Sequence, residues 1–195
     1  MFSKIRITLP ALCFYTCLLF YRSPLLLGTL AAALVHELGH LWAALACRIR
    51  IQAFTLDLLG ARLRVNDSLL SYRQEILLCL GGPLVNLLCF AEGTFLSHMG
   101  ISLSPFFEGM TLGSLCLAVV NLLPIATFDG GRILYALLCA KGSEGLAHRL
   151  LRISSLLCLG VLWLISVYLL LRYSASLPLF IFCVGMFFRL FVVST

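Results

Sequence analysis

Long apolar segments separated by short polar linkers constrain this chain more than any other feature. Six of them lie at about 7–22, 25–47, 75–97, 107–124, 147–171 and 177–194. A helix needs roughly 20 apolar residues to cross the hydrocarbon layer of a membrane. Charged residues make up only 11% of the chain, against about 25% in a soluble domain. We therefore predict an all-α polytopic membrane protein with six transmembrane helices, folded as a single domain over residues 1–195.

The basic residues indicate how these helices are oriented. If six spans alternate in direction, 12 of the 14 Lys and Arg residues fall on one side, and only Arg22 and Arg172 fall on the other. Basic loops stay in the cytoplasm, so both termini are predicted there. The net charge of +6 is thereby explained by topology, and no nucleic-acid partner is expected.

The segment from Ile51 to Val65 does not have a helical pattern. Apolar and polar residues alternate on both sides of Gly60, as in Phe54, Thr55 and Leu56. This alternation predicts two short strands that turn near Gly60. Open strand edges are not tolerated in lipid, so we expect a small membrane-associated β-hairpin after the second span, at the cytoplasmic surface or against the protein.

The second apolar segment contains His36-Glu37-Leu38-Gly39-His40. Histidines four residues apart share one face of a helix and can bind one metal ion. The glutamate after the first histidine can then accept a proton from a water molecule at the metal. The alternative is a polar contact between helices, but that role rarely requires three ionisable residues within five positions of a membrane helix.

A catalytic zinc ion usually has three protein ligands, so a third is needed. His98 and His148 are predicted at the membrane interfaces. The nine cysteines contain no Cys-x-x-Cys pair and are read as buried free thiols. Asp129 is the better candidate, because Pro124 can end the fourth span and Gly130-Gly131 lets the chain turn. A helix N-cap is an equally good explanation of Asp129 at this point.

A third polar feature is Gly81-Gly82-Pro83-Leu84-Val85-Asn86, early in the third span. Small residues allow close approach of helices, and an asparagine can form a hydrogen bond across them. A packing kink would explain the same residues.

Together, residues 36–40, 81–86 and 121–131 resemble the motifs of the site-2 protease family of intramembrane zinc metalloproteases. The six-span plan and small size look most like the branch that contains stage IV sporulation protein FB, which cleaves a membrane-tethered sigma factor precursor. Two positions depart from that branch: Thr127 stands where a second proline is usual, and Phe128 replaces a leucine. No PDZ or CBS domain is expected.

The resemblance implies that His36, His40 and Asp129 bind one Zn²⁺ per chain and that Glu37 is the catalytic general base. It further implies substrate-binding or oxyanion residues, namely Asn121, Gly81, Pro83 and Asn86. The hairpin is implied to dock an unwound substrate strand. The implied reaction is hydrolysis of peptide bonds in or near the membrane segments of membrane-tethered proteins, including transcription or sigma factors.

The expected location is a bacterial cell membrane, and the distribution of basic residues predicts an active site open to the cytoplasm. Since no sensor domain is expected, a regulatory membrane partner is predicted to control access. A different function class remains open, a non-catalytic membrane carrier or scaffold that binds zinc. Such a protein would need the metal ligands but not Glu37.

Overall fold

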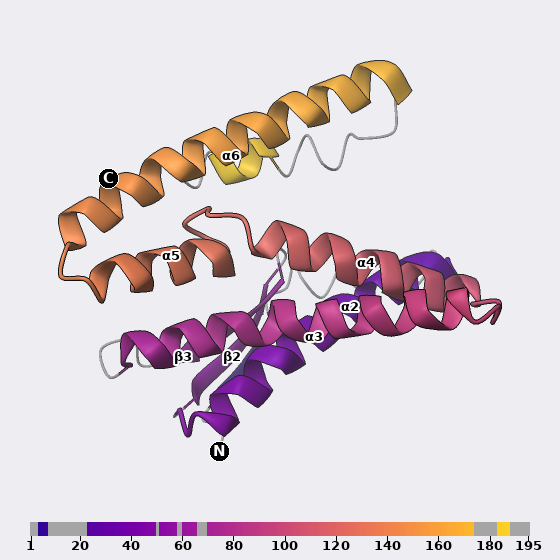
Figure 1. The fold of residues 1–195 in the computed structure, drawn as a ribbon, viewed down its shortest axis with the longest axis horizontal. Helices are drawn as coiled ribbons and strands as arrows, with labels where there is room; N and C mark the ends of the chain where they lie inside the picture. The colour runs from indigo at the N-terminus through magenta and orange to yellow at the C-terminus, as the bar shows by residue number, and fades with distance from the viewer. Residues whose placement is uncertain are drawn as a thin grey trace. The chain divides into compact units, whose positions relative to one another are not determined.

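The computed structural model describes residues 4–7, 23–49, 51–57, 60–65, 70–173 and 183–187. The chain divides into two compact units, Met1–Leu122 and Leu123–Thr195. The first unit contains, in chain order, β1 (Lys4–Ile7), α2 (Pro24–Ala46), β2 (Ile51–Asp57), β3 (Gly60–Val65), α3 (Tyr72–His98) and α4 (Pro105–Asn121) (Figure 1). The second contains α5 (Asp129–Cys139) and α6 (Glu144–Tyr173), and a helical segment at 183–187.

Side-chain caps determine where α2 and α3 begin. The Ser23 hydroxyl accepts a hydrogen bond from the Leu26 N–H at 3.5 Å, and Pro24 starts the helix with a backbone angle that is already helical. At α3, Ser71 and Gln74 form a reciprocal capping box. These caps supply partners for N–H groups that have no acceptor within the helix.

Glycines allow the helices of the first unit to pack closely. A Cβ atom on Gly28 would collide with the backbone of Phe106 in α4, and one on Gly39 would collide with the Gly81 carbonyl in α3. α2 contacts α4 at Gly28 and α3 at Gly39, and α3 and α4 also pack against each other, so the three helices form one bundle. Close backbone approach between small residues is typical of helices packed in lipid, where burial of large apolar side chains brings little gain.

The large apolar side chains of α2 lie on its opposite face. Leu34, Leu38 and Trp42 are exposed, whereas His36 and Gly39 are buried. A helix with its apolar stripe outside and its polar residues inside is suited to a lipid solvent. α2, α3 and α6 are the three described helices that are long and apolar enough to cross a membrane. The chain is an integral membrane protein.

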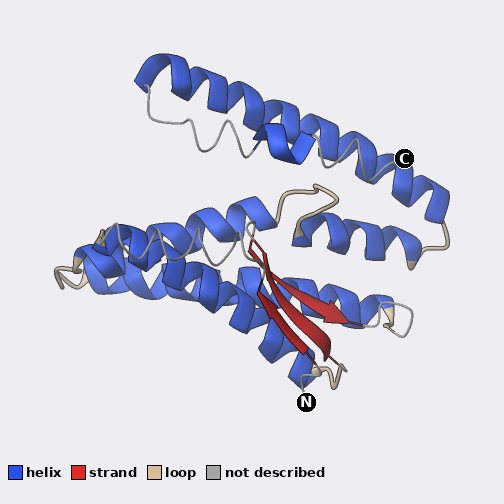
Figure 2. Ribbon diagram, turned by 180° about the vertical axis from the view of Figure 1, so that it is seen from behind, coloured by secondary structure: helices blue, strands red, loops and turns tan. Residues whose placement is uncertain are grey.

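The three strands form one sheet with the order β1-β2-β3 (Figure 2). β2 and β3 are antiparallel, with Asp57 opposite Gly60, and β1 runs parallel to β2 with Ile7 opposite Leu56. The predicted fold class needs correction here, because the chain is not all-α with a two-stranded hairpin. Local alternation cannot reveal a third strand that joins by pairing with residues almost 50 positions away.

The prediction of six spans is also wrong for the described residues, since three candidate spans are found. α4 has 17 residues and is therefore about 26 Å long, shorter than the roughly 30 Å hydrocarbon core. Ile7, the predicted start of the first span, belongs to a strand. The rest of the predicted span 7–22, and 177–194 apart from 183–187, lie outside the described residues. Apolar composition alone does not distinguish a spanning helix from a shorter one.

Candidate metal centre

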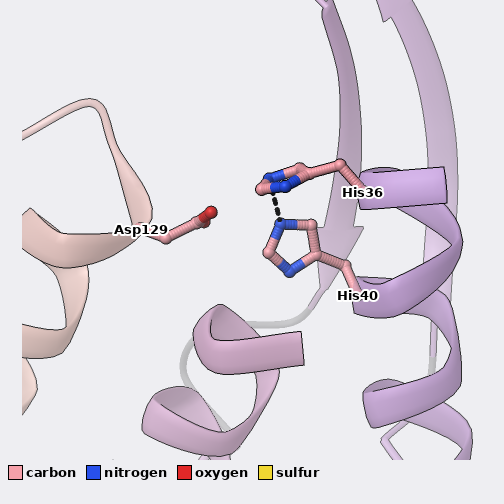
Figure 3. Close-up of side chains that lie close together, drawn as sticks. All are labelled: His36, His40 and Asp129. Carbon is pink, nitrogen blue, oxygen red and sulfur yellow. Dashed lines mark hydrogen bonds between the residues drawn. The ribbon is translucent and has the colours of Figure 1, made fainter. Parts of the chain in front are cut away.

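His36 and His40 point to the same side of α2, as their spacing predicted. Their Nε2 atoms lie 3.1 Å apart, marked by the dashed line in Figure 3. Two nitrogens bound to one tetrahedral zinc ion at about 2.0–2.1 Å would be separated by about 3.3 Å. His36 is only 5% exposed, so the pair is held within the protein. The observed separation fits two ligands of one ion.

The tautomer of His40 is fixed by α3. Its Nδ1 lies 2.8 Å from the carbonyl oxygen of Leu78. A carbonyl can only accept, so Nδ1 carries the proton and the lone pair of a neutral ring is on Nε2. A histidine ligand of zinc commonly donates its second N–H to a carbonyl in this way. His40 is thus prepared to bind a metal through Nε2.

Gly82 provides the space in front of the two histidines. A Cβ atom at this position would lie 2.5 Å from the His40 Nε2 and 2.7 Å from the His36 Nε2. Any side chain there would fill the place beside both ligand atoms. Gly82 was not among the predicted site residues, although its neighbour Gly81 was. The Gly-Gly pair was the signal, but the sequence does not show which glycine faces the histidines.

Three positions of α3 spaced by four residues therefore face this pair: the Leu78 carbonyl, the bare backbone of Gly82 and the side chain of Asn86. Pro83 lies inside the helix next to Gly82 and is buried. It has no N–H to bond the carbonyl four residues earlier, yet α3 continues without a break from Tyr72 to His98. The predicted stretch 81–86 thus lies against α2, the helix that carries His36 and His40.

Asp129 is the first residue of α5 in the second unit, and Phe128 is the N-cap. The N-cap position, for which the sequence offered Asp129, is thus held by Phe128, and Asp129 lies in the first turn of the helix. Thr127 is exposed and Phe128 is buried. The Phe128 N–H donates to the Ile125 carbonyl at 2.9 Å, which closes the turn that presents Asp129.

Two serines of α6 hold the loop that precedes Asp129. The Ser155 hydroxyl accepts from the Ala126 N–H at 2.9 Å, and the Ser154 hydroxyl donates to the Pro124 carbonyl at 2.7 Å. Ser155 is fully buried. The loop is therefore fixed by hydrogen bonds even though the usual second proline is absent at Thr127. The sequence analysis did not identify these serines, since nothing in an apolar helix marks which loop its hydroxyls contact.

Figure 3 draws the candidate ligands: the imidazoles of His36 and His40 on α2 and the carboxylate of Asp129 at the start of α5. Two imidazoles and one carboxylate are the donor set of a well-known type of catalytic zinc site. The donor chemistry, the Nε2 separation and the bare backbone at Gly82 all fit a zinc ion.

The remaining predicted residues have other surroundings. Asn121 ends α4, and its amide donates to the Leu117 carbonyl at 3.0 Å. Glu37 is half-buried on α2, next to His36. His98 is exposed at the end of α3, and His148 is exposed 3.1 Å from the Tyr135 hydroxyl. Neither of these two histidines belongs to the candidate ligand group among the described residues.

Comparisons with known proteins agree with this chemistry. The family model described as "Peptidase family M50" matches residues 90–165, a range that includes Asp129 but not His36 and His40. Stage IV sporulation protein FB of Bacillus subtilis is 32% identical over 136 residues, which cover 69% of this chain and 47% of that protein. The chain thus spans about half the length of this curated relative.

A solved structure shares the fold. The site-2 protease from Methanocaldococcus jannaschii superposes with a TM-score of 0.63 at 20% sequence identity, over 95% of this chain and 88% of that chain. At this identity the similarity shows a shared fold. The family match and the similarity to the sporulation protein are similarities of sequence. Taken together, they show that the chain belongs to the site-2 protease family, peptidase family M50, on the branch similar to stage IV sporulation protein FB.

Proposed function

We propose that this chain is a zinc-dependent intramembrane endopeptidase. The observation that carries the proposal is the pair of histidine Nε2 atoms, 3.1 Å apart, held by α3 beside a helix position that tolerates no side chain. His36, His40 and Asp129 would hold one zinc ion. A zinc ion in such a site supplies electrostatic activation of water and of the peptide carbonyl.

Glu37 is the proposed general base. It follows His36 directly on α2 and is half-buried. Its carboxylate would accept a proton from the attacking water and return that proton to the leaving amide nitrogen. The net reaction adds one water across one peptide bond and changes no oxidation state.

The proposed substrates are membrane-tethered proteins cleaved in or near their membrane segments, including transcription or sigma factors that cleavage would release. α2 is long and apolar enough to span a membrane, which puts the histidines within a lipid-embedded helix. Arg48 and Arg50 follow the end of α2 directly. Basic residues beside a span favour the cytoplasmic side of the membrane, which supports an active site open to the cytoplasm of a bacterial cell; both termini are proposed to lie on that side. A regulatory membrane partner would control access.

A substrate contact is proposed for Asn121, which is half-buried at the end of α4. Gly81 and Pro83 are buried, so they are proposed to shape the site by packing rather than to touch the substrate. β3 is an edge strand among the described residues, and its outer row of backbone groups is proposed to pair with an unwound substrate segment. Unwinding is required because a helical substrate keeps its peptide groups in its own hydrogen bonds.

Removal of zinc tests the function directly. We expect purified protein in lipid vesicles to hold one zinc per chain and to cleave a single-span reporter protein. A chelator should abolish cleavage, and Zn²⁺ should restore it. Mg²⁺ should not, because it prefers oxygen ligands and octahedral geometry. Cleavage that continues after the metal has been removed would exclude a metalloprotease.

The loop before Asp129 provides a second test. Ser155→Ala removes the acceptor of the Ala126 N–H, at a cost of about 1 kcal/mol. If Asp129 binds zinc, we expect zinc affinity to fall by up to about tenfold. Ser166→Ala is the matched control, since Ser166 is a buried serine of the same helix. Equal zinc affinities in the two variants would argue against a role of this loop in metal binding.

A further inference from the structure

Asn86 contacts the ring of His36 at the nitrogen opposite the candidate metal-binding atom. Its Nδ2 lies 3.2 Å from the His36 Nδ1, whereas the His36 Nε2 faces His40. Asn86 is 0% exposed, so neither water nor a peptide substrate reaches its amide. The other end of this amide, Oδ1, has no hydrogen-bond partner among the described residues. A buried polar atom left without a partner requires an explanation.

One hydrogen-bond arrangement of this cluster needs no metal. Asn86 Nδ2 donates to the His36 Nδ1, so the proton of the neutral ring lies on Nε2. That proton is donated to the His40 Nε2, and the His40 Nδ1 donates to the Leu78 carbonyl. Every ring nitrogen is then satisfied, but the His36 Nε2 has no lone pair to offer to a metal.

Zinc binding requires a different arrangement. Both Nε2 atoms must present lone pairs, so the proton of His36 has to lie on Nδ1. An N–H at Nδ1 needs an acceptor, and the Nδ2 amine of Asn86 cannot be one. The Oδ1 of the same amide can accept it after a 180° rotation about the last side-chain bond, because the two ends of an amide have nearly the same shape.

We propose that Asn86 is a positioning residue for the zinc ligand His36, and that its amide turns over when zinc binds. With zinc bound, Oδ1 accepts from the His36 N–H at Nδ1. Without zinc, Nδ2 donates to the same atom. An asparagine can do both because it carries a donor and an acceptor at matching positions. This inference rests on the proposed zinc site, and it assigns Asn86 to the ligand rather than to the substrate.

Two variants of similar size separate the donor from the acceptor role. Asn86→Asp offers only acceptor oxygens, which suit the zinc-bound arrangement. We expect it to match or exceed the wild-type zinc affinity, because a carboxylate behind a histidine ligand makes it a stronger ligand. Asn86→Leu offers neither group. Its zinc affinity should fall by about 10- to 100-fold, the usual cost of losing such a partner.

Zinc affinity is measured by competition with a chromogenic chelator, and the absorption spectrum of the Co²⁺-loaded protein reports ligand geometry. Zinc should raise the melting temperature more in Asn86→Asp than in the wild type, because a ligand that binds the folded protein more tightly stabilises it more. Zinc should raise the melting temperature less in Asn86→Leu than in the wild type. Ser114→Ala is the matched control, because Ser114 is another fully buried polar residue. It should leave affinity and spectrum unchanged.

Each other result counts against the proposal. Wild-type zinc affinity in Asn86→Leu with a raised KM would assign Asn86 to the substrate. Equal loss of affinity in Asn86→Asp and Asn86→Leu would mean that the donor is what matters. The zinc site itself is tested separately by His40→Ala. If that variant keeps its zinc, the proposed metal centre is wrong whatever Asn86 does.

Discussion

Glu37→Gln is expected to keep one zinc per chain and to lose cleavage by about 10²- to 10⁴-fold, the usual contribution of a general base. The amide has almost the same shape as the carboxylate but cannot accept a proton from water. His36 and His40 are also held by α3, through the Leu78 carbonyl and Asn86, so we expect both metal ligands to stay in place in this variant. Single-turnover cleavage of the reporter in vesicles measures the chemical step separately from substrate binding.

The matched control for this experiment is Glu92→Gln. Glu92 lies on the spanning helix α3 and is exposed, so the same chemical change is made within an apolar helix away from the histidines. We expect its cleavage rate and zinc content to equal those of the wild type. Full proteolysis by zinc-loaded Glu37→Gln would contradict the assigned mechanism.

The same variant distinguishes a protease from a zinc carrier or scaffold. A carrier needs its ligands but has no use for a base beside them. If the wild type cleaved no single-span reporter and Glu37→Gln bound zinc like the wild type, the carrier would be favoured. Loss of cleavage with unchanged zinc content supports the protease.

The position of His36 and His40 on one face of a helix could be predicted from the sequence, because it depends only on the spacing of nearby residues. Residues four apart share a face in any α-helix, and the predicted span 25–47 coincides closely with α2, Pro24–Ala46. The structure adds that the two Nε2 atoms meet. The number of spans could not be read in this way, since an apolar window does not reveal where a helix ends.

The contributions of α3 were only partly predictable. Gly81 and Gly82 differ by about 100° around the helix axis, and the rotation of α3 against α2 decides which one meets the histidines. Gly81 contacts the Gly39 backbone, whereas Gly82 faces the ring nitrogens. Likewise, the sequence offered Asn86 as a polar helix contact but could not name His36 as its partner. These features depend on pairing between distant segments.

Gly82→Ala is expected to reduce zinc affinity and cleavage together by about 10- to 100-fold. The added methyl would lie 2.5 Å from the His40 Nε2 and 2.7 Å from the His36 Nε2, so the rings or α3 must move. Overpacking of this kind typically costs about 1–3 kcal/mol, and 1.4 kcal/mol corresponds to a factor of ten. Zinc titration and the spectrum of the Co²⁺-loaded protein measure the effect at the site itself.

Two glycine controls show whether that effect is local. Gly160→Ala makes the same change inside the spanning helix α6, where a Cβ would meet no described residue within 4 Å, and should preserve zinc affinity. Gly81→Ala places its methyl 2.7 Å from the Ala43 Cβ and should separate α2 from α3. Its melting temperature should therefore fall with and without zinc. Gly82→Ala should mainly lose the rise in melting temperature that zinc produces, because its methyl group meets the ring nitrogens of His36 and His40. If Gly82→Ala bound zinc as tightly as Gly160→Ala, the backbone at Gly82 would not border the metal.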